Sequence, residues 1–176
     1  YKKGYGAKKE YGGGVILDLI HEIDLSLYLF GEVSSLTCLK QYTKELKIET
    51  ESIASISYKS KDGILINIIL DYLRPIMGRN MEIVCENGII TWEFVKGEIY
   101  IQTKEKPMQS LIHKVSSSFN RNDMYIEEIK SFLKVIDKEI SLDDKKNELE
   151  KSGTLNDAIN SLQVAMLCHN VAGTIL

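Results

Sequence analysis

A histidine and three carboxylates lie close together in the segment GGGVILDLIHEID, residues 12–24. Asp18 and His21 are three residues apart, as are His21 and Asp24, so on a helix either acid can hydrogen-bond the imidazole. A histidine beside carboxylates can act as a general acid or base near neutral pH. The same residues also fit the solvated face of an amphipathic helix, or a metal site that lacks a second histidine at ligand spacing. Spacing alone leaves these three interpretations open.

Three glycines, Gly12 to Gly14, come directly before this polar stretch. Glycine lets another backbone or a ligand approach closely, and the N-terminus of a helix favours anionic groups. The triplet therefore makes a functional site at this helix more plausible than the polar face alone does.

Composition and charge restrict the class of protein. The 176 residues are 44% hydrophobic and suffice for one globular domain with a sizeable core. The net charge of -3 gives no support to a nucleic-acid partner, which needs a concentrated basic surface. The apolar runs are too short for a membrane span, so we expect no membrane association. Cys38, Cys85 and Cys168 are far apart and odd in number, which predicts no disulfide framework and favours the cytoplasm.

The hydrophobic periodicity predicts an α+β fold. A loop over residues 1–11 leads into a helix over residues 14–30 that ends at Gly31. About six strands follow, joined by turn signals such as Asn87-Gly88, so the open sheet should be large and mostly antiparallel. His113 lies outside these strands, in a segment with no clear period.

Two helices close the chain and are expected to pack on one face of the sheet. Thr154 and Asp157 predict a capping box at the start of the last helix. Its buried stripe is predicted from four apolar residues at helical spacing, which are Leu155, Ile159, Leu162 and Met166.

Longer stretches of the chain resemble a known family. GGGVILDLIHEIDLSLYLFGEV is similar to the motif that opens the C-terminal domain of the glucose-fructose oxidoreductase / inositol dehydrogenase / MocA family. LDYLRP with MEIVCENGIITWE resembles the family's sheet, and YIEEIKSFLKVI and LNDAINSLQVAMLCHNVAGT resemble its two closing helices. The resemblance implies a dihydrodipicolinate-reductase-like C-terminal domain that often assembles into a homodimer or tetramer through its sheet. Residues 1–176 would form this single substrate and oligomerisation domain.

The resemblance also implies an activity. Family members are NAD(P)-dependent oxidoreductases that act on a hydroxyl group of a sugar, cyclitol or sugar nucleotide. The family's histidine matches His21, as acid/base, and its supporting aspartate matches Asp18 most nearly. In many members this aspartate lies four residues before the histidine, where Leu17 stands here. The remaining contacts implied with substrate or cofactor are Tyr1, Lys2, Tyr5, Gly13 and Asp24.

No glycine-rich dinucleotide fingerprint follows any predicted strand, so the N-terminal Rossmann domain is expected to be absent from this chain. NAD or NADP would be bound mainly by that domain, and the chain alone would be inactive. Two other functions stay open: a non-catalytic scaffold or binding module, and a metal-dependent lyase or hydrolase that uses Asp18, His21 and Asp24.

Overall fold

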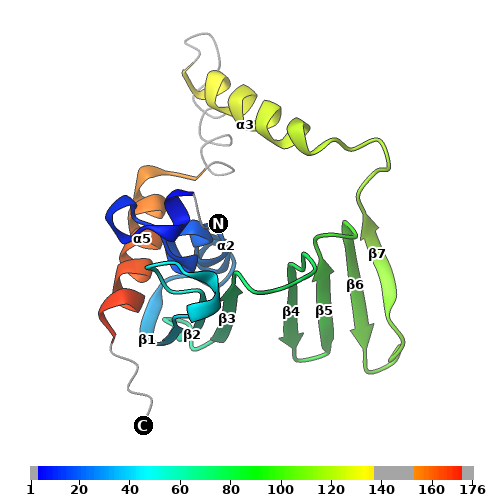
Figure 1. The fold of residues 1–176 in the computed structure, drawn as a ribbon. Coiled ribbons are helices and arrows are strands. Elements are labelled where there is room, and N and C mark those ends of the chain that lie inside the picture. Colours follow the sequence, from blue (N-terminus) through cyan, green and yellow to red (C-terminus); the bar gives the residue numbers. More distant parts are fainter. Residues whose placement is uncertain (1–3, 137–152, 172–176) are drawn as a thin grey trace. The chain divides into compact units, whose positions relative to one another are not determined.

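Two compact units make up the chain in the computed structural model, which describes residues 4–136 and 153–171 (Figure 1). The first unit comprises Tyr1–Leu73 and Leu149–Leu176, and the second comprises Arg74–Glu148. The described residues form seven strands and four α-helices, and every strand pair is antiparallel. The predicted α+β class and antiparallel pairing are therefore confirmed. The strands number seven rather than about six, and they pair in two sheets of three and four strands.

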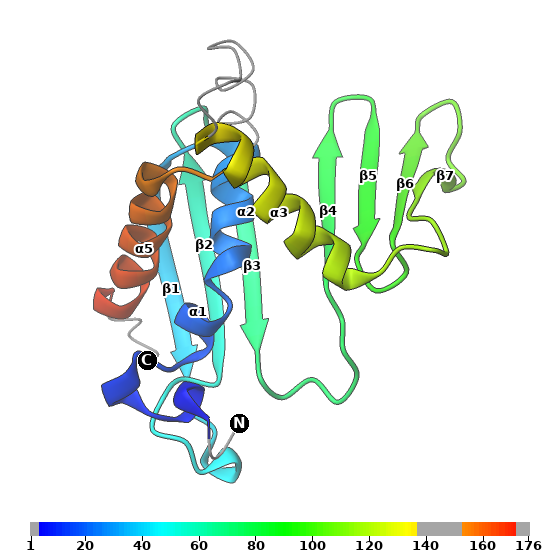
Figure 2. The same cartoon turned by 90° about the horizontal axis from the view of Figure 1, so that it is seen from above.

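The first unit is a three-stranded sheet with helices on one face (Figure 2). Its strands, in spatial order, are β1 (Val33–Gln41), β2 (Ile53–Ser60) and β3 (Leu65–Asp71). Its helices are α1 (Val15–Asp18), α2 (Ile20–Phe30) and α5 (Leu155–Asn170). α5 contacts both α2 and β1, and α1 contacts β2 and β3. The packing predicted for a closing helix is thus confirmed for α5.

The single helix predicted over residues 14–30 is wrong at one point, because Leu19 interrupts it. Leu19 has φ -107° and ψ 29°, so α1 ends at Asp18 and α2 begins at Ile20. Leucine is a good helix former, and neither glycine nor proline marks the break in the sequence. The predicted end of the helix is confirmed, since Gly31 has a φ of 79° and caps α2.

The buried face of α5 differs from the predicted one. The predicted stripe of larger side chains is exposed, and the residues that face the sheet and α2 are Ser161, Val164, Ala165 and Cys168. Small side chains let the helix axis lie close to its neighbours, which favours burial of this face. The apolar period alone could not separate two stripes on the same helix.

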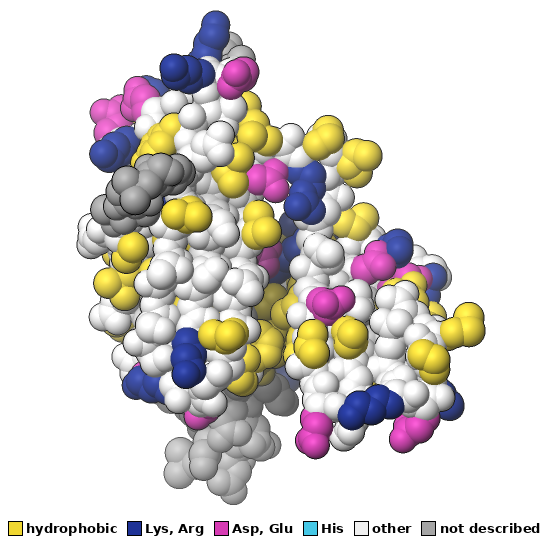
Figure 3. All heavy atoms as spheres, turned by 90° about the horizontal axis from the view of Figure 1, so that it is seen from below, with side chains coloured by type: hydrophobic (Ala, Val, Ile, Leu, Met, Phe, Trp, Pro, Cys, Tyr) yellow, Lys and Arg dark blue, Asp and Glu magenta, His cyan; other side chains and the backbone are white. Residues whose placement is uncertain are grey.

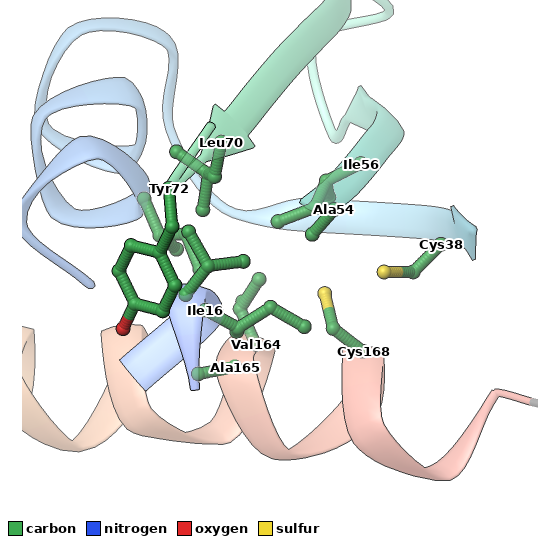
Figure 4. Close-up of a cluster of buried hydrophobic side chains, with 11 residues drawn as sticks. Ile16, Cys38, Ala54, Ile56, Leu70, Tyr72, Val164, Ala165 and Cys168 are labelled. Carbon is green, nitrogen blue, oxygen red and sulfur yellow. The ribbon is translucent and has the colours of Figure 1, made fainter. Parts of the chain in front are cut away.

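Two cysteines that lie far apart in the sequence meet in this core. Figure 4 shows the thiols of Cys38 on β1 and Cys168 on α5 pointing toward each other among the buried apolar side chains. Both are free thiols. The hydrogen bond with Cys38, together with burial, raises the pKa of Cys168. Cys168 therefore packs in this core as a small neutral side chain.

Both ends of α5 are capped. Thr154 and Asp157 form the predicted capping box at its start. At its end, the Lys40 ammonium donates to the carbonyl oxygens of Cys168 and His169, each at 2.7 Å. A cation at this position satisfies free carbonyls and complements the helix dipole.

The second unit contains a four-stranded sheet and a helix. In spatial order the strands are β4 (Asn80–Cys85), β5 (Gly88–Glu93), β6 (Glu98–Thr103) and β7 (Ser110–Lys114), and the helix is α3 (Arg121–Ile136). The predicted β4–β5 hairpin is confirmed, with Cys85 opposite Gly88. The irregular segment predicted around His113 is wrong, because these residues form β7. His113 pairs with Ile99 of β6. A register shift beside this pair disturbs the alternation on which a strand prediction depends.

No helix of the described residues is long and apolar enough to cross a membrane. On the face drawn in Figure 3, acidic and basic side chains lie interspersed among apolar ones.

Substitution of Ala165 tests which face of α5 is buried. Ala165→Leu adds a large side chain where the residue has no exposed surface, and we expect it to lower the free energy of unfolding by about 1–3 kcal/mol. Ala158→Leu, on the exposed side of the same helix, should change it by less than about 0.5 kcal/mol. Denaturant unfolding of the two variants measures the difference. Equal losses would contradict the orientation of α5.

Candidate functional site

The glycine triplet allows two close approaches within the chain itself. A Cβ atom on Gly13 would lie 2.5 Å from the carbonyl oxygens of Tyr5 and Gly6, so the preceding loop can pass only over a glycine. Gly14 has a φ of 116°, and its Cβ would lie 2.2 Å from Oε1 of Glu51. The predicted close approach at the triplet is therefore made by backbone at Gly13 and by a side chain at Gly14.

A buried carboxylate occupies the N-terminus of α1. Glu51, only 3% exposed, accepts a hydrogen bond from the Ile16 N–H at Oε1, 3.1 Å away. Its carbonyl oxygen accepts the Val15 N–H, also at 3.1 Å. These bonds satisfy two of the free N–H groups of the first turn and place a negative charge at the positive end of the helix. The negative charge expected at the N-terminus of this helix is therefore the carboxylate of Glu51.

The segment before the triplet is held against the connection between β1 and β2. It forms two short 3₁₀ helices, Tyr5–Ala7 and Lys9–Tyr11, where a loop was predicted. The Gly6 carbonyl accepts from the Thr50 hydroxyl at 2.8 Å and from the Gly14 N–H at 3.0 Å. Tyr1 and Lys2, predicted to contact substrate or cofactor, lie outside the described residues.

Asp18 accepts hydrogen bonds from two tyrosines on both of its carboxylate oxygens. Oδ1 accepts from the Tyr5 hydroxyl, and Oδ2 accepts from the Tyr72 hydroxyl at 3.1 Å. Tyr5 is 60% exposed, whereas Tyr72, directly after β3, is 8% exposed. The hydrogen bond to Asp18, reinforced by its negative charge, raises the pKa of Tyr5 above the ordinary value. The structure thus brings together Asp18 and Tyr5, both predicted as site residues, and Tyr72, which follows a distant strand and was not predicted.

His21 lies in the first turn of α2, and its side chain is 52% exposed. Its Nε2 atom lies 3.3 Å from Oε1 of Glu22. The carboxylate found beside the imidazole is therefore that of Glu22, where Asp18 or Asp24 was expected. The break at Leu19 explains part of this difference, because Asp18 and His21 belong to two different helices.

Asp24 joins two helices of the first unit. Its Oδ1 atom accepts a hydrogen bond of 2.6 Å from the hydroxyl of Ser161 on α5. This contact ties α2 to α5. Asp18, His21 and Asp24 thus have separate neighbours, and residues 4–136 and 153–171 contain no group of three or more His, Cys, Asp or Glu side chains able to hold a metal ion.

The arrangement combines an accessible imidazole with a carboxylate whose position is fixed. The imidazole is a side chain able to accept or donate a proton, and its exposure leaves room for a ligand. The sequence alone did not predict two residues that contact this arrangement, Glu51 and Tyr72. Neither belongs to a local motif, so only the tertiary contacts reveal them.

The raised pKa of Tyr5 provides a test of its bond to Asp18. We expect the Tyr5 hydroxyl to ionise above about pH 10, the ordinary tyrosine value, and Asp18→Asn to lower its pKa toward that value. Because the pKa is raised on folding, the stabilisation is present below about pH 10 and is lost as the pH rises through the folded-state value. NMR titration of tyrosine ring carbons measures it. Tyr100, whose pKa is raised by Glu98, is the internal control and should not respond to Asp18→Asn.

Solved structures share this fold. UDP-N-acetylglucosamine 3-dehydrogenase from Acidithiobacillus ferrooxidans is 17% identical, with a TM-score of 0.68 and a match over 89% of this chain and 46% of that chain. Biliverdin reductase from Synechocystis sp. PCC 6803, solved with biliverdin and NADP+, is 13% identical, with a TM-score of 0.72 over 98% of this chain and 50% of that chain. Levoglucosan dehydrogenase, solved with NADH and levoglucosan, is 15% identical, with a TM-score of 0.70 over 96% of this chain and 50% of that chain.

At these identities the likeness is evidence of a common fold, and the chain spans about half the length of the structures it matches. No curated protein matches the sequence. The family model of the GFO/IDH/MocA C-terminal domain matches residues 2–91, just over half of the chain and the part that carries the glycine triplet, Asp18 and His21. The chain therefore belongs to the GFO/IDH/MocA oxidoreductase family and is similar to its C-terminal domain.

Proposed function

We propose that this chain is the substrate half of an NAD(P)-dependent oxidoreductase that acts on a hydroxyl group of a sugar or sugar nucleotide. The observation that carries the proposal is the half-exposed imidazole of His21, which lies three residues after a carboxylate held by two tyrosines. Family membership and the dehydrogenases among the structural neighbours support the reaction class.

His21 serves as the acid/base in this proposal. Oxidation of an alcohol requires the hydroxyl to lose its proton, and reduction of the carbonyl requires the proton to return. An imidazole can perform both transfers, because a ring nitrogen accepts a proton in the neutral form and donates one in the protonated form. Its exposure lets a sugar hydroxyl reach a ring nitrogen. Asp18, with its carboxylate fixed, orients the substrate side of the same site.

The glycine triplet and the N-terminus of α1 do not fit the phosphates of a dinucleotide. The N-terminus of α1, which follows the glycine triplet, is closed by the Glu51 carboxylate. A second anion there would meet a like charge at a buried position. We therefore propose that another part of the full-length enzyme binds NAD or NADP, which supplies the hydride acceptor.

We also propose that the protein assembles into a homodimer or tetramer through its sheet and works in the cytoplasm. The β4–β7 sheet supports the first point, because one of its faces carries a run of partly exposed apolar side chains, which are Met81, Ile83, Ile90, Trp92 and Ile99. The three free cysteines support a reducing compartment.

Replacement of His21 tests the acid/base assignment. In the full-length enzyme we expect His21→Ala to lower kcat by about 10²–10⁴ while the Kd for NAD(H) stays unchanged, because general acid/base catalysis contributes that range. Steady-state kinetics and cofactor titration measure the two quantities. Tyr28→Ala, at an exposed position on the same helix, is the control and should leave both unchanged. A kcat near that of the wild type in His21→Ala would sink the assignment.

Cofactor binding tests the proposed division of the enzyme. We expect this chain alone to bind NAD(H) more weakly than micromolar in a calorimetric titration, because α1 offers a dinucleotide no free anion site. The full-length enzyme, titrated in the same buffer, should bind it. Micromolar affinity of the isolated chain would show that the chain holds the cofactor itself.

A further inference from the structure

Tyr72 connects the sheet of the first unit to the candidate site. Its N–H donates to the Ser52 carbonyl at 3.0 Å, which fixes the residue directly after β3. Figure 4 shows its ring at the edge of the buried cluster beside Ile16, with the hydroxyl pointing away from the apolar side chains. That hydroxyl donates to Oδ2 of Asp18. One carboxylate oxygen is therefore held from the rigid core.

The backbone of Gly6 closes the other side of this hydroxyl. A Cβ atom on Gly6 would lie 3.3 Å from the Tyr72 oxygen and 3.9 Å from Oδ2 of Asp18. Gly6 is in turn held through its carbonyl by Thr50 and Gly14. The Tyr72–Asp18 bond thus lies between the sheet and the segment that carries Tyr5.

The direction of the hydrogen bonds determines what Tyr5 offers to a ligand. An ionised carboxylate only accepts, so both phenols must donate their protons to Asp18. Once the Tyr5 proton is committed in this way, the free lone pair on its oxygen can only accept. Since the Tyr5 side chain is 60% exposed, it presents an acceptor toward solvent beside Asp18, the last residue of α1, and His21 follows in the first turn of α2.

We propose that Tyr72 is a positioning residue of this site: through Asp18 it fixes the Tyr5 hydroxyl as a hydrogen-bond acceptor for a hydroxyl group of the substrate. The inference rests on the proposed function, since it assumes a polyhydroxylated substrate beside His21. Tyr5 then selects a substrate group that donates a hydrogen bond, such as a hydroxyl. A carbonyl or phosphate oxygen, which only accepts, is disfavoured at this position. Tyr72 itself does not touch the substrate.

The test uses the full-length enzyme and the variants Tyr5→Phe, Tyr72→Phe and the double variant. The substrates are a panel of sugars and sugar nucleotides, each with NAD+ and NADP+. Turnover is measured from the absorbance of the reduced cofactor. We expect each single variant to raise KM about tenfold and to lower kcat less than about threefold, as for loss of a hydrogen bond at a charged acceptor. In the double variant KM should equal that of Tyr5→Phe, because both changes interrupt the same chain of hydrogen bonds from Tyr72 through Asp18 to Tyr5. A merely structural role of Tyr72 would make the effects additive.

Tyr58→Phe is the matched control. Tyr58 is a tyrosine buried on the same face of this sheet, and its hydroxyl neighbours Ser26 on α2, not Asp18. It should leave KM unchanged. If Tyr72→Phe does not fold, Asp18→Asn replaces it and must raise KM to the same extent.

The outcomes separate the inference from the function on which it rests. If the wild type is active and Tyr72→Phe behaves as Tyr58→Phe does, or adds to Tyr5→Phe, the positioning role is wrong and the proposed function stands. If the wild type turns over no member of the panel, the proposed function and the inference fall together.

Discussion

The contact between the Glu51 carboxylate and the first turn of α1 is the constraint on which the rest of the first unit depends. A buried carboxylate is costly unless it is hydrogen-bonded, and here the Ile16 N–H and the positive end of the helix compensate it. The carboxylate fits only because residue 14 is glycine with a positive φ. Val15 and Ile16 are fully buried in the core, which holds α1 on the sheet and so positions Asp18.

Asp18 has a different role from the one suggested by ideal helix spacing. On an unbroken helix a residue three before His21 would lie beside the imidazole. The break at Leu19 removes that relation, and the carboxylate is held by tyrosines from the preceding segment and from β3. The shift of this aspartate by one residue relative to many family members is therefore compatible with a role in the same site, because Asp18 is placed by its tyrosine partners.

Local patterns predicted the features that depend on neighbouring residues. They include the end of α2 at Gly31, the capping box at Thr154, the antiparallel hairpins and the position of His21 in the polar face of a helix. The features that they missed depend on distant partners: Glu51 is 35 residues from Ile16, and Tyr72 is 54 residues from Asp18. The buried face of α5 was misjudged for a related reason. Both of its sides carry apolar residues, and only the presence of β1 and α2 decides which side is covered.

The glycine triplet shows how one local signal can serve two purposes that only the fold distinguishes. Glycines before a helix are typical of phosphate-binding loops, where the backbone and the helix dipole receive an anion. Here the same two properties receive the chain's own backbone at Gly13 and its own carboxylate at Gly14. The positive end of the α1 dipole therefore interacts with the Glu51 carboxylate of the chain itself. What remains exposed at the junction of α1 and α2 is Tyr5 and His21, side chains suited to hydroxyl recognition and proton transfer. These side chains agree with the proposed transfer of an alcohol proton, and the closed N-terminus of α1 supports the proposal that the dinucleotide is bound elsewhere.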